Sequence, residues 1–272
     1  MIPFHLAPAP IVAGIVLLAL WRWNRNSWAA GLATGCGFGA GFVAVAGFTF
    51  APAAASDWLL YIAVAATAVG LLELAPRWVQ WIAQALVAVG TVWLILGRVA
   101  EPPWESPLSR FAWTSGLGAA LLVWSAALGA RPEATRGFVL PAALTITAAG
   151  ASFLLLQDGN AKLAELAAAL SMALGVVAAI AWRYRELKLA PSGTGVAATT
   201  LGALLLCGWL FGDALPVWSL LAILAAPLPA LLRTRRWWVP LALAALLAGA
   251  AVLIVHLGAE ALPAEDYGYG YD

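Results

Sequence analysis

The chain has 272 residues, of which 64% are hydrophobic and only 10% are charged. An ordinary soluble domain is about 45–50% apolar and about 25% charged, so a soluble chain of this composition could not cover its surface with polar groups. The composition therefore excludes an ordinary soluble protein and indicates an integral membrane protein, for which lipid is the solvent. The net charge of +1 gives no reason to expect a nucleic-acid partner.

Ten apolar runs of suitable length follow one another along the chain. A helix needs about 20 apolar residues to cross the roughly 30 Å of hydrocarbon in a bilayer. We therefore predict an all-α integral membrane protein, a polytopic bundle of about ten transmembrane helices that forms a single domain over residues 1–259. An acidic tail rich in Tyr and Gly follows at 260–272. The predicted spans are 4–21, 28–50, 58–75, 78–97, 110–129, 137–156, 162–182, 194–211, 215–232 and 237–257.

The eighth and ninth predicted spans leave a second topology open. Only three residues, Gly212 to Ala214, separate these two apolar runs. A re-entrant hairpin over 194–232 would therefore reduce the number of spans to eight, without changing the side on which either end of the chain lies.

The basic residues alternate from one connection to the next. Cytoplasmic connections of membrane proteins are enriched in Lys and Arg. The odd-numbered connections hold 11 of the 14 basic residues, whereas the even-numbered ones hold only Arg98, Arg110 and Lys162. This alternation predicts that both ends of the chain are non-cytoplasmic. The high Ala, Leu and Gly content suggests a bacterial inner membrane as the location. The 11 residues are Arg22, Arg25, Arg77, Arg131, Arg136, Arg183, Arg185, Lys188, Arg233, Arg235 and Arg236.

A stripe of glycines marks the second predicted span. Gly31, Gly35 and Gly39 recur at four-residue spacing, and Gly37 and Gly41 form a parallel register. Small residues let helix backbones approach closely in lipid. We expect the stripe to serve packing within the bundle, and the alternative is an interface with a partner or a second copy of the chain.

Two further features could line a path for a solute. Gln80 and Gln84 share one face of the fourth predicted span, although hydrogen bonds between helices would also explain them. Pro227 and Pro229 remove two backbone donors within the ninth predicted span. Discontinuous helices of this kind line substrate sites in transporters, whereas a plain kink or an early helix end is the simpler interpretation.

Motifs for catalysis, cofactors or metals are missing from the sequence. HExxH, GxSxG, P-loop and CxxC motifs do not occur, and no charged residue falls at the centre of a predicted span. His5 and His256 are the only histidines. They would form a shallow metal or proton site with Glu260 and Asp266 only if the first and last spans were neighbours. We therefore expect neither an enzyme, nor a cofactor, nor a metal centre.

Two functions from different classes remain. The sequence favours an accessory or structural subunit of a membrane assembly, with the bilayer and a membrane protein or a second copy as partners, because no ionisable group lies mid-span. The alternative is a small-solute permease or facilitator of ten-helix type. A lipid-modifying enzyme, the third class, should carry a tight His, Asp or Glu motif at one interface, and the sequence has none.

Overall fold

The computed structural model describes residues 4–23, 28–72, 75–99, 106–130, 137–184, 187, 189, 191–212, 215–232, 234 and 236–261. Over these ranges the chain is helical and has no strand. The 3-10 helices whose bounds lie within these ranges are η1 (Phe4–Leu6), η2 (Ala55–Asp57) and η4 (Leu228–Leu231). The α-helices are α1 (Pro8–Trp23), α2 (Trp28–Ala46), α3 (Trp58–Leu71), α4 (Arg77–Leu96), α5 (Pro107–Gly129), α6 (Val139–Gln157), α7 (Ala161–Arg183), α8 (Pro191–Phe211), α9 (Val217–Ala225) and α10 (Trp238–Ala261).

Seven of these helices are long and apolar enough to cross a bilayer: α2, α4, α5, α6, α7, α8 and α10. They indicate a multi-pass membrane protein of helical type. The prediction of ten spans rests, for α1, α3 and α9, on apolar helices of 16, 14 and 9 residues. The predicted tail falls mostly at 262–272, which lies outside the described residues.

The helix ends have local causes in the sequence. Ser106 caps α5 by accepting a hydrogen bond from the Ser109 N–H at 3.2 Å, and Pro107 occupies the first helical position. The second span ends at Ala46 and not at residue 50, because Gly47 adopts a φ of 74° that terminates the helix. The ninth ends earliest relative to the prediction, at Ala225.

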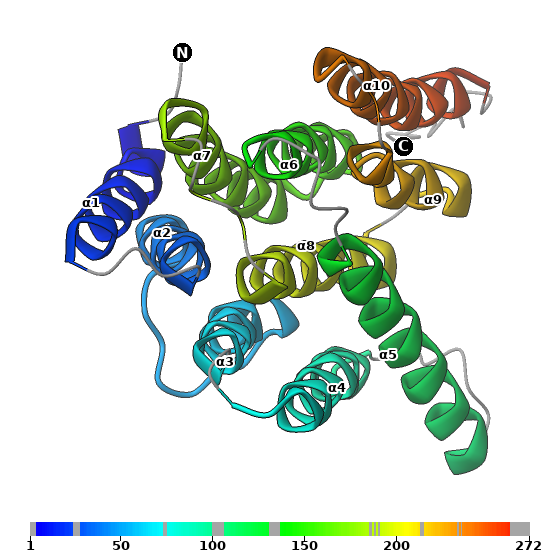
Figure 1. Ribbon diagram of the computed structural model, residues 1–272. Helices are drawn as coiled ribbons and strands as arrows, with labels where there is room; N and C mark the ends of the chain where they lie inside the picture. The colour runs from blue at the N-terminus through cyan, green and yellow to red at the C-terminus, as the bar shows by residue number, and fades with distance from the viewer. Residues whose placement is uncertain are drawn as a thin grey trace, which may run out of the picture.

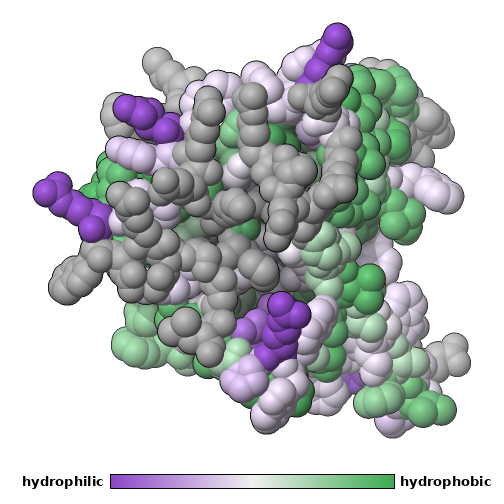
Figure 2. All heavy atoms as spheres, viewed as in Figure 1, coloured by the Kyte–Doolittle hydropathy of each residue, from purple (hydrophilic) through white to green (hydrophobic). Residues whose placement is uncertain are grey.

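The bundle is arranged around α8. This helix packs against α2, α3, α4, α5, α6 and α7, and among the long apolar helices it has the largest buried share. Figure 1 shows α1, α2, α7 and α6 along one side of it, α3 and α4 on the other, and α9 and α10 beside α6. In the same view, Figure 2 shows hydrophobic residues along the flank and scattered hydrophilic residues on the face toward the viewer.

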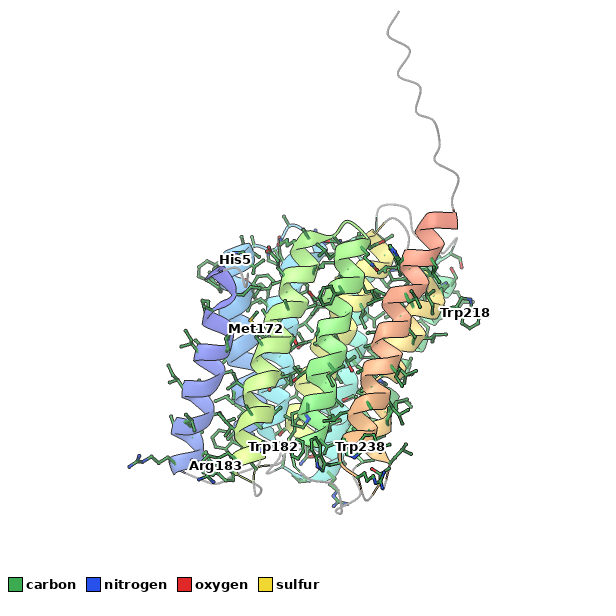
Figure 3. The ribbon with its side chains drawn as sticks, turned by 90° about the horizontal axis from the view of Figure 1, so that it is seen from above. His5, Met172, Trp182, Arg183, Trp218 and Trp238 are labelled. Carbon is green, nitrogen blue, oxygen red and sulfur yellow. The ribbon has the colours of Figure 1, made fainter. Side chains whose placement is uncertain are left out.

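The two ends of the bundle carry different side chains. Figure 3 shows His5 and Trp218 toward one end, and Trp182, Arg183 and Trp238 toward the other. We call these the His5 end and the Arg183 end. Because α7 runs from one to the other, its first turns lie at the His5 end.

The predicted glycine stripe of α2 faces α3 and α8. A Cβ atom added at Gly31 would lie 3.1 Å from the Cα atom of Gly193 in α8, and one added at Gly35 would overlap the hydroxyl of Thr67 in α3. Gly39 is looser, with its nearest neighbour in α3 at an ordinary contact distance of 3.6 Å. Gly31 and Gly35 thus permit close backbone packing inside the bundle.

The second register of the same helix faces different neighbours. A Cβ atom at Gly37 would lie 2.7 Å from the Cβ atom of Ala13 in α1 and 2.9 Å from that of Ala173 in α7. A Cβ atom at Gly41 would lie 2.6 Å from the Cβ atom of Ala169 in α7. The two glycine registers therefore seat α2 between two pairs of helices.

Candidate functional site

A polar recess opens at the Arg183 end between α4 and α5. Its volume is about 360 Å³, and Arg77, Gln80 and Gln84 from α4 and Ser125 from α5 contribute its polar side chains. The side-chain amide of Gln80 donates a 2.8 Å hydrogen bond to the carbonyl of Ala75. Gln84, one helical turn further on, forms the deeper part of the wall.

A small polar cavity lies directly behind this recess. Gln84 and Ser125 line both spaces, and Ser192 and Thr199 of the central helix α8 complete the polar lining of the inner one. A Cβ atom at Gly195 would lie 3.8 Å from Gln84 Nε2 and 3.9 Å from Ser125 Oγ, so these two side chains converge on a glycine. The cavity volume of about 20 Å³ has room for one water-sized group with several hydrogen-bonding partners.

An apolar pocket lies further along α8 than this cavity, toward the His5 end. Val92 of α4, Leu121 of α5 and Leu205 of α8 line this apolar pocket of about 210 Å³ along the next part of α8. The indole of Trp124 also lines it and donates a 2.8 Å hydrogen bond to the carbonyl of Leu224 in α9. A polar solute would lose its hydrogen bonds in this pocket.

A second recess lies at the His5 end. Its volume is about 460 Å³, and it is bounded by the η2 segment, by the C-terminal end of α4, by the start of α7 and by the end of α8. Four polar or charged side chains of the described residues line this recess, Ser56, Arg98, Asn160 and Lys162, and Cys207 and Phe211 of α8 line it as well.

An ion pair stands beside this second recess. The ammonium of Lys162 lies 3.2 Å from Asp57 Oδ1 and 3.1 Å from Ser56 Oγ. Partial burial raises the pKa of Asp57, but hydrogen bonds from the Ala54 N–H and Lys162, the charge of Lys162 and the Ala53 N–H outweigh it and lower that pKa below its ordinary value. The carboxylate is therefore ionised near neutral pH.

Helix α4 lines the recess at the Arg183 end and the inner cavity, and α8 lines the inner cavity and the recess at the His5 end. Gln84 of α4 lines the recess at the Arg183 end. Arg98, just beyond the last turn of α4, lines the recess at the His5 end. From α8 come Thr199 beside the inner cavity and Phe211 at the far recess. The two helices contact each other, so a small movement between them would alter the inner cavity that both line.

The structure places the other predicted site residues apart from these recesses. Pro227 lies between α9 and η4, and Pro229 lies inside η4. Neither belongs to the described lining of the two recesses or the inner cavity. The prolines therefore end the α-helix early, and they do not share a site with Gln80 and Gln84.

The histidines do not meet either. His5 Nε2 lies 3.3 Å from Glu165 Oε1 of α7, whereas His256 lies on α10, at the opposite edge of the bundle from α1 (Figure 1). Asp266, the other carboxylate considered with Glu260, lies outside the described residues. Within the ranges described, no group of three or more His, Cys, Asp or Glu side chains is placed to hold a metal ion.

Sequence patterns pointed to only part of this site. The pair Gln80 and Gln84 was recognisable from its helical spacing. Ser125 was not, because one hydroxyl in a long apolar run has no distinguishing neighbour. Arg98 and Lys162 carried a signal, since both are exceptions to the charge alternation, but nothing in the sequence indicated that they meet.

The fold and the recesses define a class, a multi-pass helical membrane protein with a polar recess at each end. No protein-family model matches the chain, and no curated protein matches it. The function is therefore inferred from the geometry of the recesses.

Proposed function

We propose that the chain is a small-solute permease, in which α4 and α8 line the path. The observation that carries this proposal is the polar inner cavity, which α4, α5 and α8 line behind the recess at the Arg183 end, together with a second recess at the opposite end that α8 also lines. Alternating access requires such a site near the membrane interior that each end can reach in turn. This geometry favours the permease over the accessory subunit that the sequence alone favours.

The proposal includes ten crossings and two non-cytoplasmic ends. The apolar helices Pro8–Arg22, Ala55–Leu71 and Val217–Leu231 are shorter than a full span. A bilayer accommodates short spans by local thinning, at a modest cost. The enrichment of basic residues in the odd-numbered connections supports the Arg183 end as the cytoplasmic one, in a bacterial inner membrane.

Passage is proposed to be facilitated and not coupled to protons or ions. Coupled carriers place a carboxylate or histidine along the path at membrane depth. The charged side chains of the described residues lie within the first or last two turns of their helices or beyond them. Gln84, Ser125 and Thr199 instead offer neutral hydrogen-bonding groups. No catalytic role is proposed.

Flux through proteoliposomes tests the permease. We expect protein-dependent flux in a panel of glycerol, urea and succinate, and Gln84→Leu should lower it about tenfold by removing a hydrogen-bonding partner of the solute. Gly195→Ala should also lower the flux, because the added methyl group narrows the inner cavity. The fold should tolerate this change, since the new Cβ would lie no closer than 3.8 Å to any atom of another helix.

Gly175→Ala is the matched control, because its Cβ would make an ordinary 3.5 Å contact with Thr145, and neither residue belongs to the described lining of the recesses or the inner cavity. Its flux should equal that of the unaltered chain. Absence of protein-dependent flux for every solute, or equal flux in the Gln84→Leu variant, would contradict the permease.

An exposed flank supports the second candidate, an accessory subunit. Helix α5 packs mainly on α4 and α8, and Figure 1 shows it leaning out of the bundle. Leu108, Phe111 and Val123 on this helix are 78%, 66% and 67% exposed. Native mass spectrometry after gentle extraction separates the candidates. A partner protein at fixed stoichiometry would support the subunit, whereas a lone chain or a homo-oligomer would contradict it.

A further inference from the structure

We propose that the recess at the His5 end is a binding site for an oxyanion, the phosphate or carboxylate group of a small solute or of a lipid. Two cations, Arg98 and Lys162, line this recess of about 460 Å³, and its described lining includes no carboxylate. The hydroxyl of Ser56 and the amide of Asn160 add hydrogen-bonding groups to the same wall. Arg and Lys side chains are the usual partners of such anions.

Within the part of the chain that the structure describes, the positive charge of the recess is not fully compensated. Lys162 pairs with Asp57, which is 17% exposed, at 3.2 Å. Arg98 donates only long hydrogen bonds, of 3.4 Å to the carbonyl of Ala53 and 3.5 Å to that of Pro52, and pairs with no carboxylate among the described residues. Counted over the described residues, two cations and one neighbouring anion leave a charge of about +1 at the recess.

Two other carboxylate side chains are described at this end, and each has a neighbour of its own. Glu165 lies 3.3 Å from His5 Nε2. Asp158 is only 8% exposed and lies against the backbone of Gly212, at the end of α8. Neither Glu165 nor Asp158 belongs to the described lining of the recess.

A purely structural role would explain the position of Arg98, but it would not explain why Arg98 and Lys162 line the same recess. An arginine just beyond the C-terminal end of α4 is stabilised by the helix dipole and by free carbonyls. The same reasoning does not apply to Lys162, which lies at the start of α7. Both belong to the three basic residues that break the charge alternation of the sequence, and the fold brings these two from distant segments to one cavity.

Binding is measured without transport, on the full chain in nanodiscs of phosphatidylcholine, with inorganic phosphate and succinate titrated by calorimetry. We expect saturable binding of at least one of them, weakened about tenfold or more in Arg98→Gln because a charge-assisted hydrogen bond is lost. Arg98→Lys should retain most of the affinity by keeping the charge. Arg22→Gln is the control, since Arg22 is an exposed cation at the far end of α1.

A second arm separates the sources of the oxyanion. Nanodiscs that contain phosphatidylglycerol are examined by native mass spectrometry for lipid that stays bound to the chain. Retained lipid that is lost in Arg98→Gln, without binding of soluble anions, would assign the site to a headgroup. Binding of neither, or binding unchanged in Arg98→Gln, would overturn the proposal. The interpretation of this site as the mouth of a permease rests on the proposed function. A chain that binds anions but shows no flux would refute the permease and leave the binding site in place.

Discussion

At the scale of single residues, an indole nitrogen compensates for a helix broken by proline. The α-helix α9 ends at Ala225, because Pro227 and Pro229 lack the N–H groups that would continue it. A backbone carbonyl left without a donor at membrane depth is costly. The 2.8 Å hydrogen bond from Trp124 Nε1 to the carbonyl of Leu224 meets this need from a neighbouring helix.

We predict that Trp124→Phe destabilises the protein by about 1–2 kcal/mol, because it removes this donor and little volume. The free energy of unfolding would be measured by SDS titration in mixed micelles. Trp218→Phe is the control, since Trp218 lies on α9 and is 73% exposed. Equal stability of the two variants would show that the hydrogen bond contributes nothing.

The ion pair of Asp57 and Lys162 predicts a dependence of stability on pH. The pKa of Asp57 is lowered from its ordinary value of 3.8, so the folded state favours the ionised carboxylate. Its contribution is fully present above that ordinary value and is lost as the pH falls through the lower pKa of the folded state. Between pH 5 and pH 3, the stability difference between the unaltered chain and Asp57→Asn should therefore shrink. A constant difference would mean that the pair contributes through contacts and not through charge.

Residue types alone could not single out the polar site. Gln84 was predictable, because an amide one turn from a second amide stands out in an apolar helix. Ser125 and Ser192 resemble any other hydroxyl in a membrane helix, where bonding to a carbonyl one turn back is common. Ser125 faces Gly195 across a helix interface, and Ser192 lines the same cavity from α8, and both placements are tertiary properties.

At the scale of elements, the glycines of α2 differ in how tightly they pack against neighbouring helices. Gly35 faces the side chain of Thr67. The Thr67 hydroxyl donates a 2.6 Å hydrogen bond to the carbonyl of Ala63, and the β-branched side chain has little rotamer freedom. Gly39, one turn away, has ordinary space around it. The same residue type at the same spacing is thus under very different constraint.

We predict that Gly35→Ala destabilises the bundle by about 1–3 kcal/mol, because α2 and α3 must separate to admit the methyl group. Gly39→Ala should change stability by less than about 0.5 kcal/mol. Thermal unfolding of the purified variants in detergent would measure both. An equal loss of stability in Gly39→Ala and Gly35→Ala would contradict the tight contact between Gly35 and α3.

The central position of α8 was hidden in the sequence. Its apolar run was the least certain to cross the membrane, because only three residues separate it from the next run. In the structure it is one of the seven long apolar helices and has six neighbouring helices. A helix apolar on all sides can face lipid or protein, so its composition does not reveal which.

At the scale of the whole molecule, topology follows from which connections lie at the Arg183 end. In a background with Cys36→Ala and Cys207→Ala, a cysteine at Asp213 should react with a membrane-impermeant maleimide in intact cells, because α8 crosses fully. A cysteine at Thr234 should react only after permeabilisation, since it follows η4 near the basic connection.

The opposite labelling pattern would invert the proposed orientation. Unreactive Asp213→Cys in both conditions would instead favour the re-entrant hairpin and eight spans. Reaction of both cysteines in intact cells would mean that the α9 and η4 segment does not cross the bilayer.

The sequence by itself determined that this chain is an all-helical membrane protein and where its helices lie, with boundaries within four residues of the prediction except at the end of α9. The physical reason is that the length and apolarity of a span are local properties, set by the thickness of the hydrocarbon. Only the tertiary structure decided that Arg98 and Lys162 share a recess, that Gln84 and Ser125 meet opposite Gly195, and that α8 is the centre of the bundle. Helices in lipid associate through shape and sparse polar contacts and not through a hydrophobic pattern, so the choice of neighbours leaves little trace in the sequence.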